Sequence, residues 1–167
     1  GTTACRLTET ADSNTHYIYQ SMMLGVNSIF ESSIYLKAGT RSKVAIKLNN
    51  KLLSGIGGVV FVDLSDGSIH SSSIGAFDVS ITQVESTGWY RVTFKSNSLD
   101  GIYTCSFNII TCSDTWSFVT AGSGTIGIYG AQLLQIDNLL MQYLDFSTTS
   151  KWSVYNSVIT SGQVDAY

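Results

Sequence analysis

Proline is absent from this chain of 167 residues, and charged residues are scarce. Asp, Glu, Lys and Arg make up 13% of the sequence, whereas about 25% is usual for a globular domain. The absence of proline excludes collagen-like and proline-rich disordered chains, and the low charge excludes a coiled coil rich in Glu and Lys. Ser and Thr are abundant, so hydroxyl groups replace charges on the predicted surface.

Basic residues are few, and long apolar runs are missing. Nine Lys and Arg stand against twelve Asp and Glu, for a net charge of −3, and they form no basic stripe that would displace counterions from nucleic acid. Apolar runs such as 59–62 fall far short of the roughly 20 residues that span a bilayer. We therefore expect no nucleic-acid partner and no membrane insertion. No signal-peptide pattern is visible, and the abrupt start at Gly1 favours a fragment or a processed piece.

The three cysteines, Cys5, Cys105 and Cys112, are odd in number, which argues against a disulfide framework. Free buried thiols are the favoured interpretation, and a Cys105–Cys112 bond across a hairpin is the alternative. No Cys-x-x-Cys pair occurs, and His16 and His70 lie far apart in the sequence. No metal site and no cofactor are therefore predicted.

Apolar residues make up 44% of the sequence, and most of them alternate with polar residues. In 16–22 the alternation places Tyr17 and Tyr19 on one face of a strand and Ile18 on the other. Further strands are predicted at 29–37, 42–48, 59–64, 77–85, 89–94, 102–110 and 125–134, with turn signals roughly every 8–12 residues, as in a sandwich. Residues 132–144 fit a helical stripe, but Asp137-Asn138 interrupts it and favours a strand, a turn and another segment. The predicted fold class is all-β, an antiparallel two-sheet β-sandwich.

Six segments carry a family resemblance: ACRLTET (4–10), YIYQ (17–20), SIYLKAG (33–39), FVDLSDG (61–67), GWYRV (88–92) and GIYGAQL (127–133). In this order they resemble the jelly-roll modules, similar to carbohydrate-binding modules with a concanavalin A-like sandwich, of bacteriophage tail-fibre and other virion structural proteins. The resemblance covers most of the chain. It implies a jelly roll with adhesive or glycan-binding duty, no catalytic machinery, a buried Trp89, and a virion or extracellular location. Leu134-Gln135 departs from the pattern, because an acidic residue often follows the Gly-Ala-Gln-Leu motif.

The same resemblance places the usual opening of such a module at the end of this chain. Segments like Asn138-Leu139-Leu140 and Asp145-Phe146-Ser147 normally come first, so the chain resembles one repeat cut out of phase or a circular permutant. We expect residues 1–137 to form the sandwich body and residues 138–167 to complete it, in the same molecule or in a neighbour, because a missing strand leaves an open edge. Self-association into a ring, trimer or fibre would use Phe146, Trp152, Val154 and Val158.

Catalysis is not predicted, because no set of catalytic residues can be nominated. Among the twelve carboxylates, only Glu31 is expected in the middle of a strand, with strand on both sides, and it has no evident mate for a glycosidase pair. The nucleophile elbow Gly-x-Ser-x-Gly is absent from the sequence.

Two functions of different classes remain. The first is a structural and adhesive module that assembles with copies of itself, and the alternative is a module that binds host-surface polysaccharide by aromatic stacking. The candidate glycan-binding residues are Trp116, Tyr103, Tyr17 and Tyr19, with Tyr35 on the same sheet face. Trp116 lies near a turn, where an exposed platform and the rim of the core are equally favoured.

Overall fold

The computed structural model describes residues 4–24, 29–50, 58–73, 75–97, 103–136, 140–143 and 153–161, and every regular element in these ranges is a β-strand. The strands are β1 (Cys5–Glu9), β2 (Asn14–Thr15), β3 (Tyr17–Leu24), β4 (Ile29–Ala38), β5 (Lys43–Asn50), β6 (Val59–Asp63), β7 (Ser68–Ser72), β8 (Ala76–Val84), β9 (Trp89–Asn97), β10 (Tyr103–Thr111), β11 (Val119–Thr120), β12 (Thr125–Gln135), β13 (Leu140–Tyr143), β14 (Ser153–Tyr155) and β15 (Ser157–Ser161).

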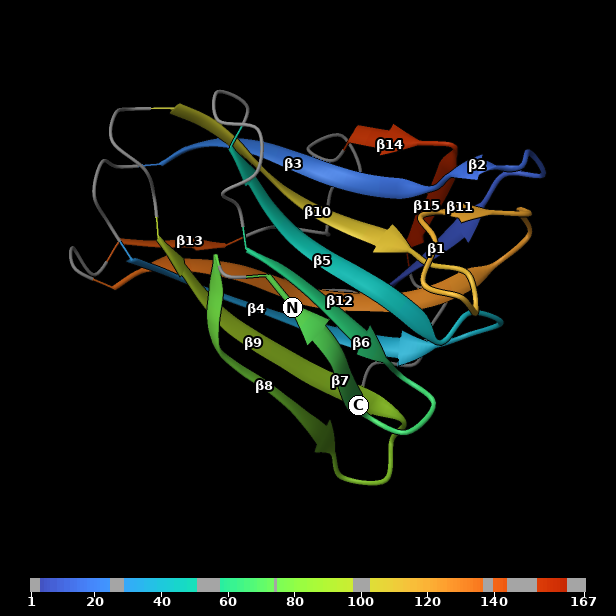
Figure 1. The fold of residues 1–167 in the computed structure, drawn as a ribbon, viewed down its shortest axis with the longest axis horizontal. Coiled ribbons are helices and arrows are strands. Elements are labelled where there is room, and N and C mark those ends of the chain that lie inside the picture. The colour runs from blue at the N-terminus through green and yellow to red at the C-terminus, as the bar shows by residue number, and fades with distance from the viewer. Residues whose placement is uncertain are drawn as a thin grey trace.

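Two large antiparallel sheets lie face to face (Figure 1). The seven-stranded sheet has the order β15-β1-β12-β4-β9-β8, with β13 also paired to β12, and the six-stranded sheet has the order β14-β3-β10-β5-β6-β7. Strands β2 and β11 form a separate antiparallel pair. The protein is an all-β antiparallel sandwich, which confirms the predicted fold class.

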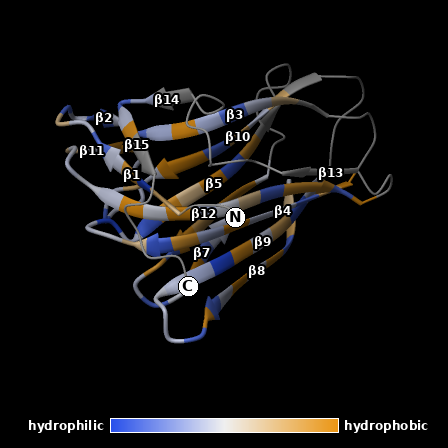
Figure 2. Ribbon diagram, turned by 180° about the vertical axis from the view of Figure 1, so that it is seen from behind, coloured by the Kyte–Doolittle hydropathy of each residue, from blue (hydrophilic) through white to orange (hydrophobic). Residues whose placement is uncertain are grey.

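The core lies between the two sheets and follows from the alternation along each strand. On β5, Val44, Ile46 and Leu48 are buried in this core, whereas Lys43 and Lys47 on the opposite side of the strand are half-buried. Figure 2 shows this alternation as changes between orange and blue or white along the strands. The inward side chains of both sheets join in one cluster, and each large one contributes roughly 1.5–3 kcal/mol by its burial.

The C-terminal strands close one edge of each sheet within the same chain. β14 pairs with β3 of the six-stranded sheet, and β15 pairs with β1 of the seven-stranded sheet. The chain crosses between the sheets at Asn156, which has a φ of 49°, a conformation that Asn tolerates better than most residues. The Asn156 carbonyl accepts a hydrogen bond from the Thr10 amide at 2.9 Å, and its side-chain Nδ2 donates to the Thr15 carbonyl at 3.1 Å.

The long strand β12 has two neighbours on one side. β1 pairs with its first half, from Thr125 to Ile128, and β13 pairs with its second half, from Gln132 to Gln135. Between the two halves, from Tyr129 to Gln132, the register of β12 with its other neighbour β4 shifts, and Gly130 in this stretch has a φ of 56°. A strand near the N-terminus and a strand near the C-terminus thus share one position in the sheet.

Candidate functional site

The outer face of the six-stranded sheet carries a continuous row of apolar and aromatic side chains. Each member of the row pairs with the next across neighbouring strands: Tyr155, Tyr17, Ile110, Ala45 and Phe61. Ala45 and Ile110 belong to a small apolar cluster outside the main core, and Tyr17 and Phe61 pack against it. We call this surface the aromatic face.

A tyrosine cluster, made of Tyr17, Tyr19 and Tyr155, lies at the β14 edge of the aromatic face. The rings of Tyr17 and Tyr155 stack with centroids 5.0 Å apart and an interplanar angle of 25°, and Tyr19 lies 5.9 Å from Tyr17. Tyr155 is the most open of the three rings, with 45% of its surface exposed. Burial, together with the neighbouring Tyr155 and Tyr19, raises the pKa of the Tyr17 hydroxyl, so this phenol remains neutral and is able both to donate and to accept a hydrogen bond.

A tryptophan cluster lies toward β6 and β7 and consists of Phe61, His70, Trp116 and Phe118. The Trp116 indole stacks on the His70 imidazole with centroids 4.1 Å apart, and it makes a T-shaped contact with Phe61 with centroids 6.1 Å apart. Phe118 stacks on Phe61 at 5.6 Å. Trp116 is held with a φ of 64° by a turn in which its amide donates to the Ser113 carbonyl at 2.9 Å.

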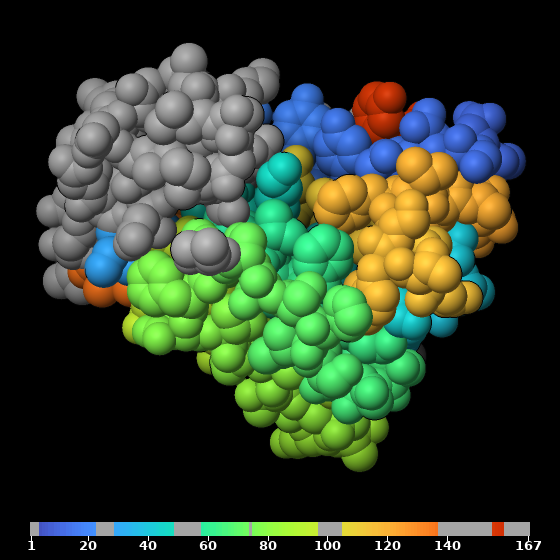
Figure 3. Space-filling model, in the orientation of Figure 1, coloured from blue at the N-terminus to red at the C-terminus, as the bar shows by residue number. Residues whose placement is uncertain are grey.

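The two clusters lie on one surface and are linked by the row of the sheet. Trp116 packs on the same small apolar cluster as Tyr17. Figure 3 shows the loop between β10 and β12 in orange against the green surface of β6 and β7, with β3 in blue and β14 in red along the same side of the molecule. Ile110 and Ala45, which link the two clusters, are only 7% and 0% exposed, so a ligand on this surface would contact the rings of the clusters rather than these two residues.

Polar groups lie between and beside the two clusters. The side-chain amide of Asn108 on β10 donates to the Ser106 carbonyl at 2.9 Å and to the Lys47 carbonyl at 3.3 Å, which fixes its orientation. The Lys43 ammonium donates to the Asp114 carbonyl at 3.0 Å and lies 3.7 Å from the Asp63 carboxylate. Asn108 is buried, with 8% of its surface exposed, and Lys43 is bonded within the fold, so the groups left to bind sugar hydroxyls are the half-buried phenols of Tyr17 and Tyr19.

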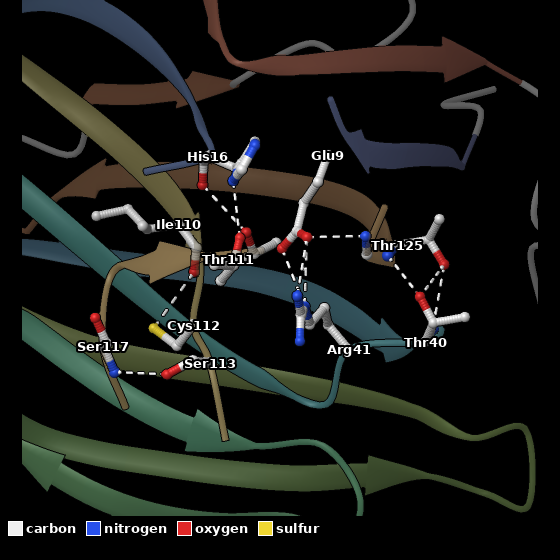
Figure 4. A network of polar contacts seen from close by, with 12 residues as sticks. Glu9, His16, Thr40, Arg41, Ile110, Thr111, Cys112, Ser113, Ser117 and Thr125 are labelled. Carbon is white, nitrogen blue, oxygen red and sulfur yellow. Dashed lines mark hydrogen bonds and ion pairs between the residues drawn. The ribbon is translucent and has the colours of Figure 1, made fainter. Parts of the chain in front are cut away.

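A buried ion pair anchors the loops at one end of the sandwich (Figure 4). Glu9, whose side chain has 0% exposure, accepts hydrogen bonds from Arg41 Nε at 3.1 Å, Arg41 Nη2 at 3.2 Å and the Gly124 amide at 2.8 Å. Burial would raise the pKa of the Glu9 carboxyl, but hydrogen bonds from Arg41, Thr111, Gly124 and Thr120 outweigh it and hold this pKa below its ordinary value. Because the carboxylate is fully buried and already bonded, we assign it a structural role.

All three cysteines are free and buried. The favoured interpretation of the sequence is therefore confirmed, and the alternative Cys105–Cys112 bond is wrong. Burial raises the pKa of the Cys105 and Cys112 thiols to about 12. Neither group is a thiolate at neutral pH, so neither is suited to act as a nucleophile.

The structure brings Trp116, Tyr17 and Tyr19 to one surface but separates them from Tyr35. Tyr35 lies on β4 of the other sheet, beside Tyr129 at 5.7 Å, so its placement on the same face was wrong. An alternating strand reveals which side a residue takes but not which sheet it joins. Tyr103 begins β10 and pairs with Leu24, and its side chain lies outside the described residues.

Two of the four residues predicted for assembly, Val154 and Val158, lie in the last described segment. Phe146 and Trp152 lie outside the described residues. Val154 pairs with Ile18 in β14, and Val158 pairs with Thr8 in β15 and is 53% exposed.

The sequence did not single out Phe61, His70, Phe118 or Tyr155 for the aromatic face. Phe61 lies in the apolar run 59–62, which has no alternation to show that its side chain points outward. His70 lies on β7, where all five residues are exposed. The position of Tyr155 on the aromatic face results from the pairing of β14 with β3, and no local sequence pattern indicates this pairing.

Within the described ranges, no group of three or more His, Cys, Asp or Glu side chains is placed to hold a metal ion. No helix in the described part of the chain is long and apolar enough to cross a membrane. No protein-family model matches the sequence, and no curated protein matches it.

Proposed function

We propose that the protein is a non-catalytic adhesive module that binds polysaccharide through the aromatic face. The observation that carries the proposal is the tyrosine cluster, in which Tyr17 and Tyr155 stack, Tyr155 is 45% exposed and Tyr19 lies beside them. The apolar face of a sugar ring stacks on an aromatic ring in the same way as other flat apolar groups, while sugar hydroxyls need polar partners at the ring edge.

The two aromatic clusters would serve this function differently. His70 stacks directly on Trp116, and the Lys43 ammonium lies 5.3 Å from the centroid of the Trp116 indole ring. Trp116 already has these intramolecular partners, so we assign it to the rim of the site. Tyr155, with 45% of its surface exposed, has the most ring surface to offer and is the proposed platform.

The test is affinity gel electrophoresis of the purified chain against a panel of neutral and acidic polysaccharides. We expect retardation by at least one polysaccharide, a loss of about tenfold in affinity for Tyr19→Ala and for Tyr155→Ala, and no loss for Tyr35→Ala. Tyr35 is the matched control because it is a half-buried tyrosine on the outer face of the other sheet. Equal losses for Tyr35→Ala and Tyr155→Ala, or no retardation at all, would contradict the proposal.

A second candidate function is self-assembly into a virion or other extracellular fibre, and the exposed edge formed by β14 and β15 favours it. Both strands lie at the edges of their sheets, and Val158 on β15 is 53% exposed. Exposed apolar edge strands are ready templates for pairing with a second chain. With this candidate function we also propose the jelly-roll connectivity and the phage-fibre origin that the sequence resemblance implies.

Light scattering behind size exclusion, over a hundredfold range of concentration, tests self-assembly. We expect a ring, trimer or fibre that dissociates when Val158→Lys places a charge on the edge. A monomer at every concentration would contradict this candidate and leave the glycan proposal intact.

A further inference from the structure

Lys47 lies on the aromatic face at a position where its ammonium group could pair with a negative charge on a bound ligand. It lies on β5 between Asn108 of β10 and Val59 of β6, and Asn108 in turn pairs with Tyr19. Lys47 is therefore two strands away from Tyr19, a Cα separation of about 10 Å. Its half-buried side chain lies between the tyrosine cluster and Phe61, which is its diagonal neighbour on β6.

No carboxylate surrounds Lys47 among the described residues of this face. Its partners across the sheet are Asn108 and Val59, and its diagonal neighbours there are Ser106, Ile110 and Phe61. The nearest acidic residue in the register is Asp63, which pairs with Lys43. Lys43 lies four residues from Lys47 along β5, so the two positions are about 13 Å apart.

The other lysine on the outer side of β5 provides a contrast. Lys43 is bound to the Asp114 carbonyl at 3.0 Å and to the Asp63 carboxylate at 3.7 Å, and it covers the Trp116 ring. Lys43 therefore acts within the fold. Lys47 has no such ion pair among the described residues, and its described neighbours on this face are rings and neutral polar groups.

We propose that the polysaccharide bound by this face is acidic, and that Lys47 pairs with a carboxylate of a uronic or similar sugar acid whose neighbouring ring stacks on the tyrosine cluster. This inference rests on the proposed glycan-binding function and adds the ligand's charge to it. A carboxylate in this position would form a charge-assisted hydrogen bond with the ammonium, which is stronger than a bond between neutral groups. Without the carboxylate, the lysine would lose hydration next to the ligand and gain no compensating partner.

The experiment compares polygalacturonate, alginate and hyaluronan with the carboxyl-reduced derivative of each, in which the acid sugars have become neutral sugars with an otherwise similar backbone. The variants are Lys47→Gln and, as the matched control, Lys95→Gln, whose ammonium lies on the other sheet and is paired with Asp78 at 2.8 Å. We expect at least one acidic polysaccharide to bind and its reduced derivative to bind at least tenfold more weakly. We also expect Lys47→Gln to lose about tenfold in affinity, with a weaker dependence on salt, and Lys95→Gln to bind as the wild type does.

The remaining outcomes separate this inference from the function on which it rests. If reduced or neutral polysaccharides bind as tightly as the acidic ones, or if Lys47→Gln binds the acidic ones unchanged, the inference is overturned and the glycan-binding function stands. If no polysaccharide of either kind binds, both are overturned. Far-ultraviolet circular dichroism of each variant shows whether the sandwich is intact.

Discussion

Replacing Glu9 with glutamine is expected to destabilise the sandwich more than any conservative change to a surface charge. Glutamine keeps the size of the side chain and an acceptor for the Gly124 amide, but it removes the charge that pairs with Arg41. The Arg41 side chain is only 19% exposed, so little water can replace the lost carboxylate.

The magnitude follows from this burial. Removing one partner of a buried ion pair costs about 3–5 kcal/mol because the other charge is left uncompensated. Partial exposure of Arg41 places Glu9→Gln at the lower end, about 3 kcal/mol, which is a large share of the roughly 5–15 kcal/mol that stabilises a typical domain. For a chain of this length, a loss of that size lowers Tm by about 6–12 °C.

The assay is urea and thermal unfolding of Glu9→Gln and the wild type, followed by circular dichroism between pH 7 and pH 3. The pKa of Glu9 is lowered in the folded protein. The carboxylate's contribution is therefore complete above the unfolded-state pKa of about 4.3 and is lost as the pH falls through the lower folded-state pKa. The difference in free energy of unfolding between the wild type and Glu9→Gln should be constant near neutral pH and should decrease below about pH 4.

Asp78→Asn is the control, because Asp78 and Lys95 form a shorter ion pair, at 2.8 Å, whose carboxylate side is 61% exposed. An exposed pair contributes about 0–1 kcal/mol, so this variant should unfold nearly as the wild type does. The reasoning is refuted if Asp78→Asn costs as much as Glu9→Gln, or if the Glu9→Gln gap does not change with pH.

Two further predictions concern the interior and the turns. Cys5, Cys105 and Cys112 are buried, so a thiol reagent at pH 8 should label none of them in the native protein and all of them after unfolding; rapid native labelling would show that these thiols are accessible. Gly122→Ala should cost more than about 2 kcal/mol, because an added Cβ would overlap the Thr10 carbonyl oxygen at a φ of 84°. Gly88→Ala, at a φ of 75° but with the nearest atom 3.6 Å away, should cost only the backbone term of about 1 kcal/mol; equal losses in urea unfolding would contradict the steric argument.

The strands were predictable from sequence where polar and apolar residues alternate, and the placement of Tyr17 and Tyr19 on one face, opposite Ile18, followed from the same pattern. The Asp66-Gly67 pair is a common hairpin signal, and it lies between β6 and β7 with Gly67 at a φ of 71°. Such features depend on neighbours in the sequence. Residues 132–144 also fit a helical stripe, and the lack of a good N-cap together with the Asp137-Asn138 interruption favoured the strand, turn and further segment that β12 and β13 confirm.

The buried network and the full aromatic face could not be predicted because they join distant segments. Glu9 lies 32 residues from Arg41 and 115 residues from Gly124, and nothing near Glu9 in the sequence marks it as a buried carboxylate. Tyr155 joins Tyr17 only because β14 crosses to the six-stranded sheet. The positions of Glu9 and Tyr155 therefore depend on which sheet each strand joins and in what order, and the local sequence pattern does not reveal this.

The central claim is that the aromatic face is the ligand-binding surface. The most direct measurement is nuclear magnetic resonance mapping of the labelled chain with a short oligosaccharide of whichever polysaccharide retards it most in the gel. The predicted result is a set of amide shifts confined to β3, β14 and the adjacent parts of β10 and β5, including Tyr17, Tyr19 and Lys47. Shifts confined to β4, β9 and β12 of the seven-stranded sheet, or no shifts at saturating oligosaccharide, would contradict it.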